Sequence, residues 1–155
     1  MTWVLLLPHL ATSYMNDRFF VDTNLLVYAY DGSMGAKHAA VLKLFHQLFR
    51  SGSGVISTQV LQELAVCLRR KVGRPPSSAE IRKIITELQV EWEVFVNGTE
   101  SILHALALAD RFQISFWDSL ILQAAQATSS AILYTEDLNH SQRYDSVRVI
   151  NPFKM

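Results

Sequence analysis

The sequence predicts one α/β domain, in which a central, mostly parallel sheet is flanked by helices on both faces. Short apolar runs alternate along the chain with longer segments whose apolar residues recur at helical spacing. The chain has 155 residues, of which 50% are hydrophobic, so it can form one continuous core without disulfides. Several acidic residues follow the apolar runs, and functional groups in such sheets gather beyond the carboxyl ends of the strands.

The predicted elements alternate along most of the chain. The strands are expected over residues 19–21, 55–57, 93–96, 131–134 and 147–150. The helices are expected over 25–30, 36–49, 59–71, from Ser77 towards Trp92, over 99–112 and over 118–127. A strand followed by a helix and another strand favours parallel pairing, because the helix returns the chain to the same end of the sheet.

Turn-forming and capping residues separate these elements. Ser51-Gly52-Ser53-Gly54 ends the second helix, and Gly73 with the Pro75-Pro76 pair ends the third. Ser77 and Glu80 stand three residues apart, which is the spacing of a capping box at the start of a helix. Ser115-Phe116-Trp117 leads into the last predicted helix.

Composition and charge narrow the classes of function. Lys and Arg together number 14, as do Asp and Glu, so the chain lacks the strong basic field that attracts nucleic acid over long range. The single cysteine, Cys67, cannot form an intramolecular disulfide, and no Cys or His cluster has zinc-binding spacing. We therefore expect a cytoplasmic protein without a membrane association.

Residues 1–15 are expected to be an N-terminal extension in front of a domain over residues 18–153. The apolar run over 3–7 is short and is followed by a proline, and no Lys or Arg precedes Arg18, so the segment does not match a signal peptide. Met15 stands just before the first predicted strand and is a candidate natural start.

Two acidic residues in the first half of the chain are expected at the edge of the core. Asp22 directly follows a buried strand, so its carboxylate should project at the sheet edge, and a helix N-cap is the alternative. Glu63 flanks an apolar helical stripe that includes Val60 and Leu64, so it should lean towards the core edge. The alternative for Glu63 is a salt bridge with a neighbour such as Arg70.

Two further acids lie in the second half. Asp118 begins a helix among apolar side chains, although an acid in a first helical turn is commonly a cap or a partner of the helix dipole. Asp137 follows the strand over 131–134 and adjoins Glu136. One of these two neighbours should face the site and the other solvent, and the sequence does not decide which.

A divalent cation would allow several carboxylates to remain ionised together in apolar surroundings. Carboxylate oxygens without Cys or His favour Mg²⁺ or Mn²⁺, and such a site supports hydrolysis of a phosphodiester. Polar residues beside the acids could orient the carboxylates or bound water, and these are Thr23, Asn24, Ser57, Ser119 and Thr135. An ordinary turn or capping role is the alternative for each.

Four motifs carry a resemblance to a known family. They are Phe20-Val21-Asp22-Thr23-Asn24, Gln62-Glu63-Leu64, Phe116-Trp117-Asp118-Ser119 and Tyr134-Thr135-Glu136-Asp137-Leu138. In this order they resemble the PIN-domain nucleases, especially the VapC-type toxins of bacterial toxin–antitoxin pairs. The resemblance spans nearly all of residues 18–153 and implies a PIN-like α/β/α sandwich.

The resemblance also implies an activity, a cofactor and partners. A PIN-like protein of this type is expected to be a Mg²⁺- or Mn²⁺-dependent endoribonuclease that cuts single-stranded or loop RNA and arrests growth as a toxin. It is expected to form homodimers and to bind an inhibitory antitoxin. Asp22, Glu63 and Asp118 match the family's three acidic metal ligands, Asp137 matches its more variable fourth acid, and Thr23 and Asn24 match the polar residues after the first acid.

Other readings of the sequence remain open. Arg69, Arg70, Lys71 and Arg74 form the densest basic cluster, which is either a phosphate contact or a solvated helix end. A catalytically inactive PIN-like module that binds RNA or protein is the main alternative to the nuclease. A phosphatase with Asp22 as nucleophile is less favoured, because Asn24 stands where that family has its usual second Asp.

Overall fold

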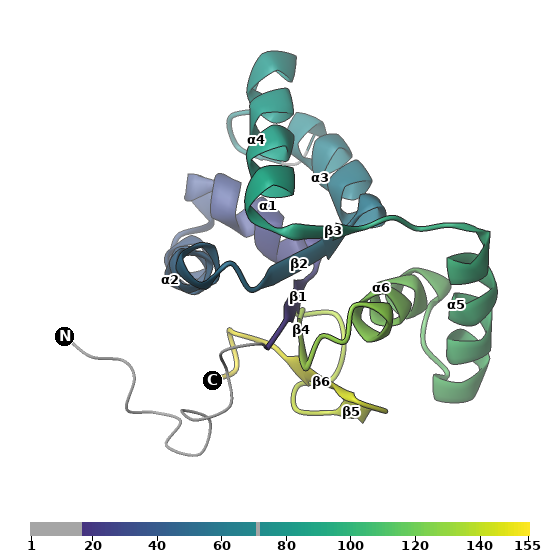
Figure 1. Ribbon diagram of the computed structural model, residues 1–155. Coiled ribbons are helices and arrows are strands. Elements are labelled where there is room, and N and C mark those ends of the chain that lie inside the picture. The colour runs from purple at the N-terminus through teal and green to yellow at the C-terminus, as the bar shows by residue number, and fades with distance from the viewer. Residues whose placement is uncertain (1–16, 71) are drawn as a thin grey trace.

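Six strands of the described chain form one sheet, in the order β3-β2-β1-β4-β6-β5 (Figure 1). The computed structural model describes residues 17–70 and 72–155, so the expected extension over 1–15 and the predicted phosphate contact Lys71 lie outside the described residues. The strands are β1 (Phe19–Val21), β2 (Gly54–Ser57), β3 (Glu93–Phe95), β4 (Ile132–Tyr134), β5 (Arg143–Tyr144) and β6 (Val147–Ile150). All neighbouring strands are parallel except β5 and β6, which confirms the predicted, mostly parallel sheet.

The predicted helices are confirmed, with small shifts at their ends. They are α1 (Thr23–Tyr30), α2 (Ala36–Ser51), α3 (Thr58–Arg70), α4 (Ser78–Glu91), α5 (Thr99–Phe112) and α6 (Phe116–Ala127), and a short 3-10 helix, η3 (Gly32–Met34), follows α1. The predicted capping box is present, because the Ser77 and Glu80 side chains each accept a hydrogen bond from the other residue's backbone N–H.

Helices cover both faces of the sheet. In Figure 1, α1 and α2 lie on one side of the strands, and α5 and α6 lie on the other. α6 packs against β2, β4 and β6, while α5 packs on α6. α3 contacts α1 and β2, and α4 contacts α3. This arrangement confirms the predicted α/β/α layers.

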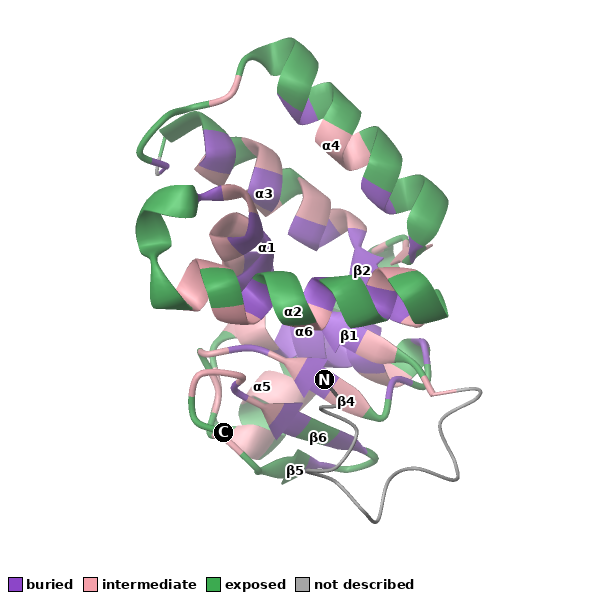
Figure 2. Cartoon of the chain, turned by 90° about the vertical axis from the view of Figure 1, so that its left-hand side faces the viewer, coloured by how far each residue is buried: buried purple, intermediate pink, exposed green. Residues whose placement is uncertain are grey.

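The core follows from the apolar residues of the strands and from the inward faces of the helices. Phe20 and Val21 of β1 and Leu133 of β4 are fully buried. Figure 2 shows buried residues along the central strands and on α6, with exposed outer faces on α2 and α4. The six residues Leu120–Ala125 of α6 are all buried, which explains why this helix is apolar on more than one face. None of the helices within residues 17–70 and 72–155 combines the length and the apolar character that a membrane span requires.

The sheet topology brings two distant chain segments to one point. β1 lies between β2 and β4, so the order of strands reverses direction at β1. Val21 pairs with Tyr134, so β1 and β4 end side by side, and Asp22 and Thr135 are the next residues of each chain segment. In open α/β sheets, such a reversal leaves a crevice beyond the carboxyl ends of the strands.

Gly54 belongs to β2, which flanks β1 on the side away from β4, and it provides a test of the packing there. A Cβ atom placed on Gly54 would lie 2.4 Å from atoms of the buried Trp92 ring, so Gly54→Ala forces the ring or strand to move. We expect Gly54→Ala to lower the free energy of unfolding by about 1–3 kcal/mol, as overpacking does. Urea denaturation measures this loss.

Gly32→Ala is the matched control, because a Cβ at Gly32 meets no atom within 4 Å. Equal stability of the two variants would contradict the close contact between β2 and Trp92.

Candidate functional site

Asp22 is the most buried acid at the carboxyl edge of the sheet, with 6% of its surface exposed. One carboxylate oxygen accepts a hydrogen bond from the Thr23 backbone N–H at 2.6 Å, and the other accepts one from the Thr135 hydroxyl at 2.8 Å. Asp22 therefore acts as the N-cap of α1 and also faces the end of β4. It has both of the positions that the sequence left open, at the sheet edge and at a helix N-terminus. Burial raises its pKa to about 7, and the negative charges of Asp137 and Glu63 add to the increase.

Glu63 reaches the same edge from α3. Its two oxygens accept hydrogen bonds from the Thr23 hydroxyl and from the Gln59 side-chain amide, each at 2.9 Å. These bonds confirm that Glu63 leans towards the core edge. Among the described residues it forms no ion pair with Arg70, which was the alternative. Thr23 thus joins the environments of Asp22 and Glu63.

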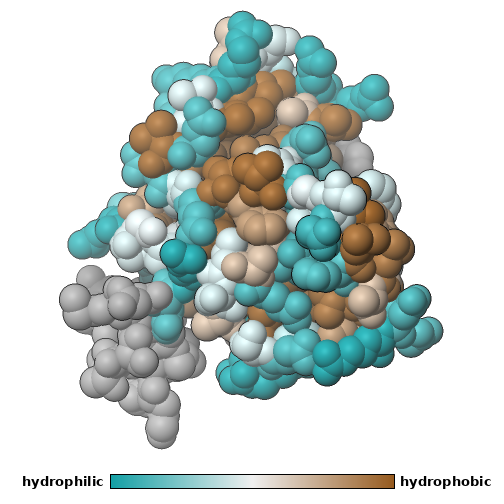
Figure 3. Space-filling view, turned by 45° about the vertical axis from the view of Figure 1, so that its right-hand side comes forward, coloured by the Kyte–Doolittle hydropathy of each residue, from teal (hydrophilic) through white to brown (hydrophobic). Residues whose placement is uncertain are grey.

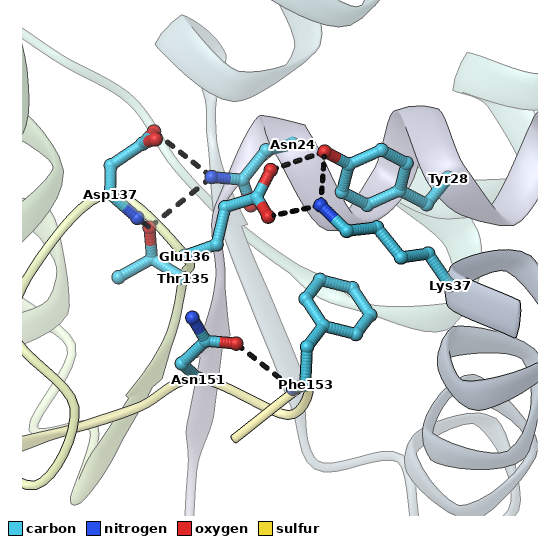
Figure 4. A network of polar contacts seen from close by, with 8 residues as sticks. All are labelled: Asn24, Tyr28, Lys37, Thr135, Glu136, Asp137, Asn151 and Phe153. Atoms are coloured by element: carbon cyan, nitrogen blue, oxygen red, sulfur yellow. Dashed lines mark hydrogen bonds and ion pairs between the residues drawn. The ribbon is translucent and has the colours of Figure 1, made fainter. Parts of the chain in front are cut away.

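Asp137, rather than Glu136, faces this site. The Asn24 amide donates to the Asp137 carboxylate at 2.9 Å, and the Asp137 backbone N–H donates to the Thr135 hydroxyl at 3.1 Å. Figure 4 shows the Glu136 side chain turned instead towards Tyr28 and Lys37. Burial raises the pKa of Asp137, and the charges of Asp118, Glu136 and Glu63 contribute.

Asp118 approaches from the first turn of α6. The Ser115 hydroxyl donates to its carboxylate at 2.7 Å and accepts from its backbone N–H at 3.1 Å, so Asp118 and Ser115 cap the helix together. Asp118 therefore has the capping role that was the alternative. The negative charge of Asp118 also contributes to the raised pKa of Asp137.

The oxygen donors of the four acids suit a hydrated Mg²⁺ or Mn²⁺. Their donors are all carboxylate oxygens, and Asn24 Oδ1 and Gln59 Oε1 are buried acceptors without a partner in the described chain, which suits water around a cation. Among the described residues, no group of three or more His, Cys, Asp or Glu side chains is already placed to hold a metal ion. The hydrogen bonds to Thr23, Gln59, Asn24 and Ser115 hold the carboxylates in their present rotamers.

The predicted supporting residues divide into two groups. Thr23, Asn24 and Thr135 bond directly to the acids. Ser57 accepts from the backbone N–H of Val60 at 3.3 Å, which is a capping role at the start of α3, and Ser119 donates to the Ser115 carbonyl at 2.8 Å within α6. Gln59 was missed, although its position four residues before Glu63 on one helix would have indicated the contact.

Arg69 and Arg70 of the basic cluster are the last residues of α3, and Arg74 follows the helix. Arg69 donates to the Ser78 hydroxyl at 3.0 Å, which joins α3 to the start of α4. Arg70 and Arg74 are exposed. Arg69 thus has a structural contact, while Arg70 and Arg74 are accessible to a ligand.

Fold and site define an α/β protein with a carboxylate cluster where the strand order reverses. The chain belongs to the PIN domain family, whose sequence model matches residues 19–145. This match confirms the family that the four motifs resemble. A comparison with curated protein sequences finds no match.

Solved structures share the fold at low sequence identity. A toxin–antitoxin complex from Klebsiella pneumoniae is 15% identical, with a TM-score of 0.63, over 88% of this chain and 98% of that chain. VapC20 of Mycobacterium tuberculosis, a toxin that cleaves the sarcin-ricin loop, is 19% identical, with a TM-score of 0.59, over 77% and 91%. DNA-bound VapBC from Salmonella typhimurium is 17% identical, with a TM-score of 0.59, over 86% and 96%.

The raised pKa of Asp22 predicts a pH dependence of stability. Its pKa rises from 3.8 to about 7 in the folded protein, so the stabilisation from the bound proton is complete below pH 3.8 and is lost as the pH rises through 7. In EDTA, the free energy of unfolding should therefore fall between pH 5 and pH 8 by a few kcal/mol more in the wild type than in Asp22→Asn. Urea denaturation at several pH values measures both slopes, and parallel slopes would contradict the buried, protonatable Asp22.

Proposed function

We propose that this protein is a Mg²⁺- or Mn²⁺-dependent endoribonuclease and the toxin of a type II toxin–antitoxin pair. The observation that carries the proposal is the convergence of Asp22, Glu63 and Asp137 at the end of β1, joined by hydrogen bonds through Thr23, Asn24 and Thr135. Asp118 adds a fourth negative charge from α6. Membership of the PIN domain family supports the same activity.

Different residues of the chain have different roles in such a site. A bound Mg²⁺ or Mn²⁺ would activate water and stabilise the charge that develops on the phosphate. Thr23 and Thr135 orient the Asp22 carboxylate from two sides at the end of β1. Gln59 and Thr23 orient Glu63, and Asn24 orients Asp137. We propose that Asp22, Glu63, Asp118 and Asp137 are the cation ligands.

RNA is the proposed substrate, and Arg70 is a proposed phosphate contact. Arg70 is seven residues after Glu63 on α3, so the two residues lie on the same side of the helix about 10 Å apart along its axis. A phosphate of an RNA strand entering the acidic site could reach this exposed guanidinium. Because the chain has no net charge, local contacts of this kind have to supply the attraction.

The proposed protein partners are an antitoxin and a second copy of the chain, in the cytoplasm. The solved structures similar to this chain include toxin–antitoxin complexes, which supports an antitoxin partner. Helix α5 exposes Ile102, Leu103 and Leu106, each with about half of its surface accessible. The view that brings the α5 side forward shows several hydrophobic patches on the surface (Figure 3). Such patches are typical of surfaces that bind another protein.

Asp118→Asn tests the nuclease directly. Asn retains the backbone N–H that bonds to Ser115 and the shape of the side chain, so the fold should be preserved. Loss of one ligand charge should reduce RNA cleavage at least about 100-fold, since ligand charge and placement determine metal-assisted catalysis. Cleavage of a pool of single-stranded and structured RNAs with Mn²⁺ measures this.

Asp110→Asn, an exposed acid of α5, is the matched control. Full activity of Asp118→Asn would reject Asp118 as a ligand of the cation. Folded wild type that binds Mn²⁺ and cuts no RNA would favour the inactive binding module.

Arg70→Ala tests the phosphate contact. Loss of one contact should weaken binding of different RNA sequences by a similar factor and reduce the slope of log Kd against log salt by about one. Fluorescence anisotropy of labelled single-stranded RNA at several salt concentrations gives both values. Arg82→Ala, an exposed arginine of α4, is the control, and an unchanged slope in Arg70→Ala would remove Arg70 from the RNA path.

A further inference from the structure

Glu136 and Asp137 are neighbours in the segment after β4, yet their side chains point in different directions (Figure 4). Asp137 turns to Asn24 in the first turn of α1, beside the acidic site. Glu136 turns to Tyr28 near the end of α1 and to Lys37 at the start of α2. The same short segment is therefore held at two points, one inside the site and one outside it.

Glu136 is anchored by two donors. Lys37 Nζ lies 2.8 Å from one carboxylate oxygen, the Tyr28 hydroxyl donates to the other, and Lys37 also donates to the Tyr28 hydroxyl at 3.3 Å. The side chains of Lys37 and Glu136 are 41% and 22% exposed. For comparison, Lys83 and Glu87 on α4 are 3.9 Å apart and 77% and 56% exposed. Charge-assisted hydrogen bonds between partly shielded groups are stronger than a longer, more exposed ion pair of this kind.

Two aromatic rings fix the ammonium group of Lys37. Its Nζ lies 4.7 Å from the centre of the Tyr28 ring and 5.0 Å from that of Phe153, a geometry that favours cation–π attraction. The two rings meet edge to face with centres 5.5 Å apart. The Asn151 side chain accepts a hydrogen bond from the Phe153 backbone N–H at 2.9 Å, so the second ring is itself held in place.

Movement of the segment from Thr135 to Asp137 would also affect the buried Asp22. The Thr135 hydroxyl donates to Asp22 at 2.8 Å and accepts from the Asp137 backbone N–H at 3.1 Å. A shift of the chain between Thr135 and Asp137 would therefore change the surroundings of both acids. A released Glu136 would also place a second mobile carboxylate next to Asp137.

We propose that Lys37 is a positioning residue for the cation site, which holds Glu136 against α1 and α2 and thereby keeps Asp137 turned towards Asn24, the second residue after Asp22. The inference rests on the proposed function, because it assigns the held acid to a cation site. Lys37 acts through Glu136 and does not itself contact the acids of the site.

Direct binding of Mn²⁺ to Lys37→Met tests this inference. Methionine keeps an apolar stem against the two rings and removes the charge that holds Glu136. Isothermal titration calorimetry should show Mn²⁺ binding weakened by about tenfold or more, as for loss of residues that orient metal ligands. The Mn²⁺ concentration for half-maximal RNA cleavage should rise by a similar factor, while cleavage at saturating Mn²⁺ recovers.

Lys37→Arg keeps a positive charge that can donate charge-assisted hydrogen bonds to Glu136 and should retain most of the Mn²⁺ affinity. Lys83→Met is the matched control on α4. Thermal melting in EDTA verifies that each variant is folded, and Lys37→Gln replaces Lys37→Met if the latter does not fold. Wild-type affinity in the folded, uncharged variant would overturn the role of Lys37.

The same titrations separate this inference from the proposed function. Mn²⁺ binding that depends on Lys37, in a protein that cuts no RNA, would support the positioning role and reject the nuclease. Wild-type protein that binds Mn²⁺ no better than Asp22→Asn would overturn the cation site and the positioning role together.

Discussion

Burial of the Asp22 carboxylate among other acids is the constraint on which the site depends. Removing a carboxylate from water costs free energy, and neighbouring negative charges increase that cost, which is why the pKa of Asp22 rises to about 7. Two hydrogen bonds, from Thr23 and Thr135, offset part of the cost. The surrounding polar side chains hold several carboxylates close together, as the proposed cation site requires.

The sheet creates this crowding through its order of strands. β1 occupies the centre of the sheet, and β2 and β4 reach it from parts of the chain far apart in sequence. α3 begins directly after β2 and carries Glu63, while the segment after β4 carries Asp137. Parallel pairing therefore brings Asp22 and Asp137 to one edge, the packing of α3 on α1 adds Glu63, and α6 supplies Asp118 from the opposite face of the sheet. The stability of the core and the arrangement of the acids have the same origin.

Patterns that are local in the sequence were predictable, and contacts between distant segments were not. The placement of Asp22 followed from one apolar run and one acid, because a buried strand has to end at the sheet edge. The strand β5 was missed because Arg143 and Tyr144 are too few residues to show a period of two, and a tight turn at Asp145, with φ of 55°, joins them to β6. The sequence also could not decide between Glu136 and Asp137, because the answer lies with Lys37 and Tyr28, about a hundred residues earlier.

A crystal structure of the protein soaked with Mn²⁺, with the anomalous signal of manganese measured, tests the cation site most directly. The expected result is a manganese peak beyond the carboxyl end of β1, ligated by Asp22 and by oxygens of Glu63, Asp118 or Asp137, with these side chains turned from their present hydrogen bonds. A crystal without manganese at this edge, in which Asp22 still bonds to Thr23 and Thr135, would contradict the site and the metal-dependent chemistry proposed for it.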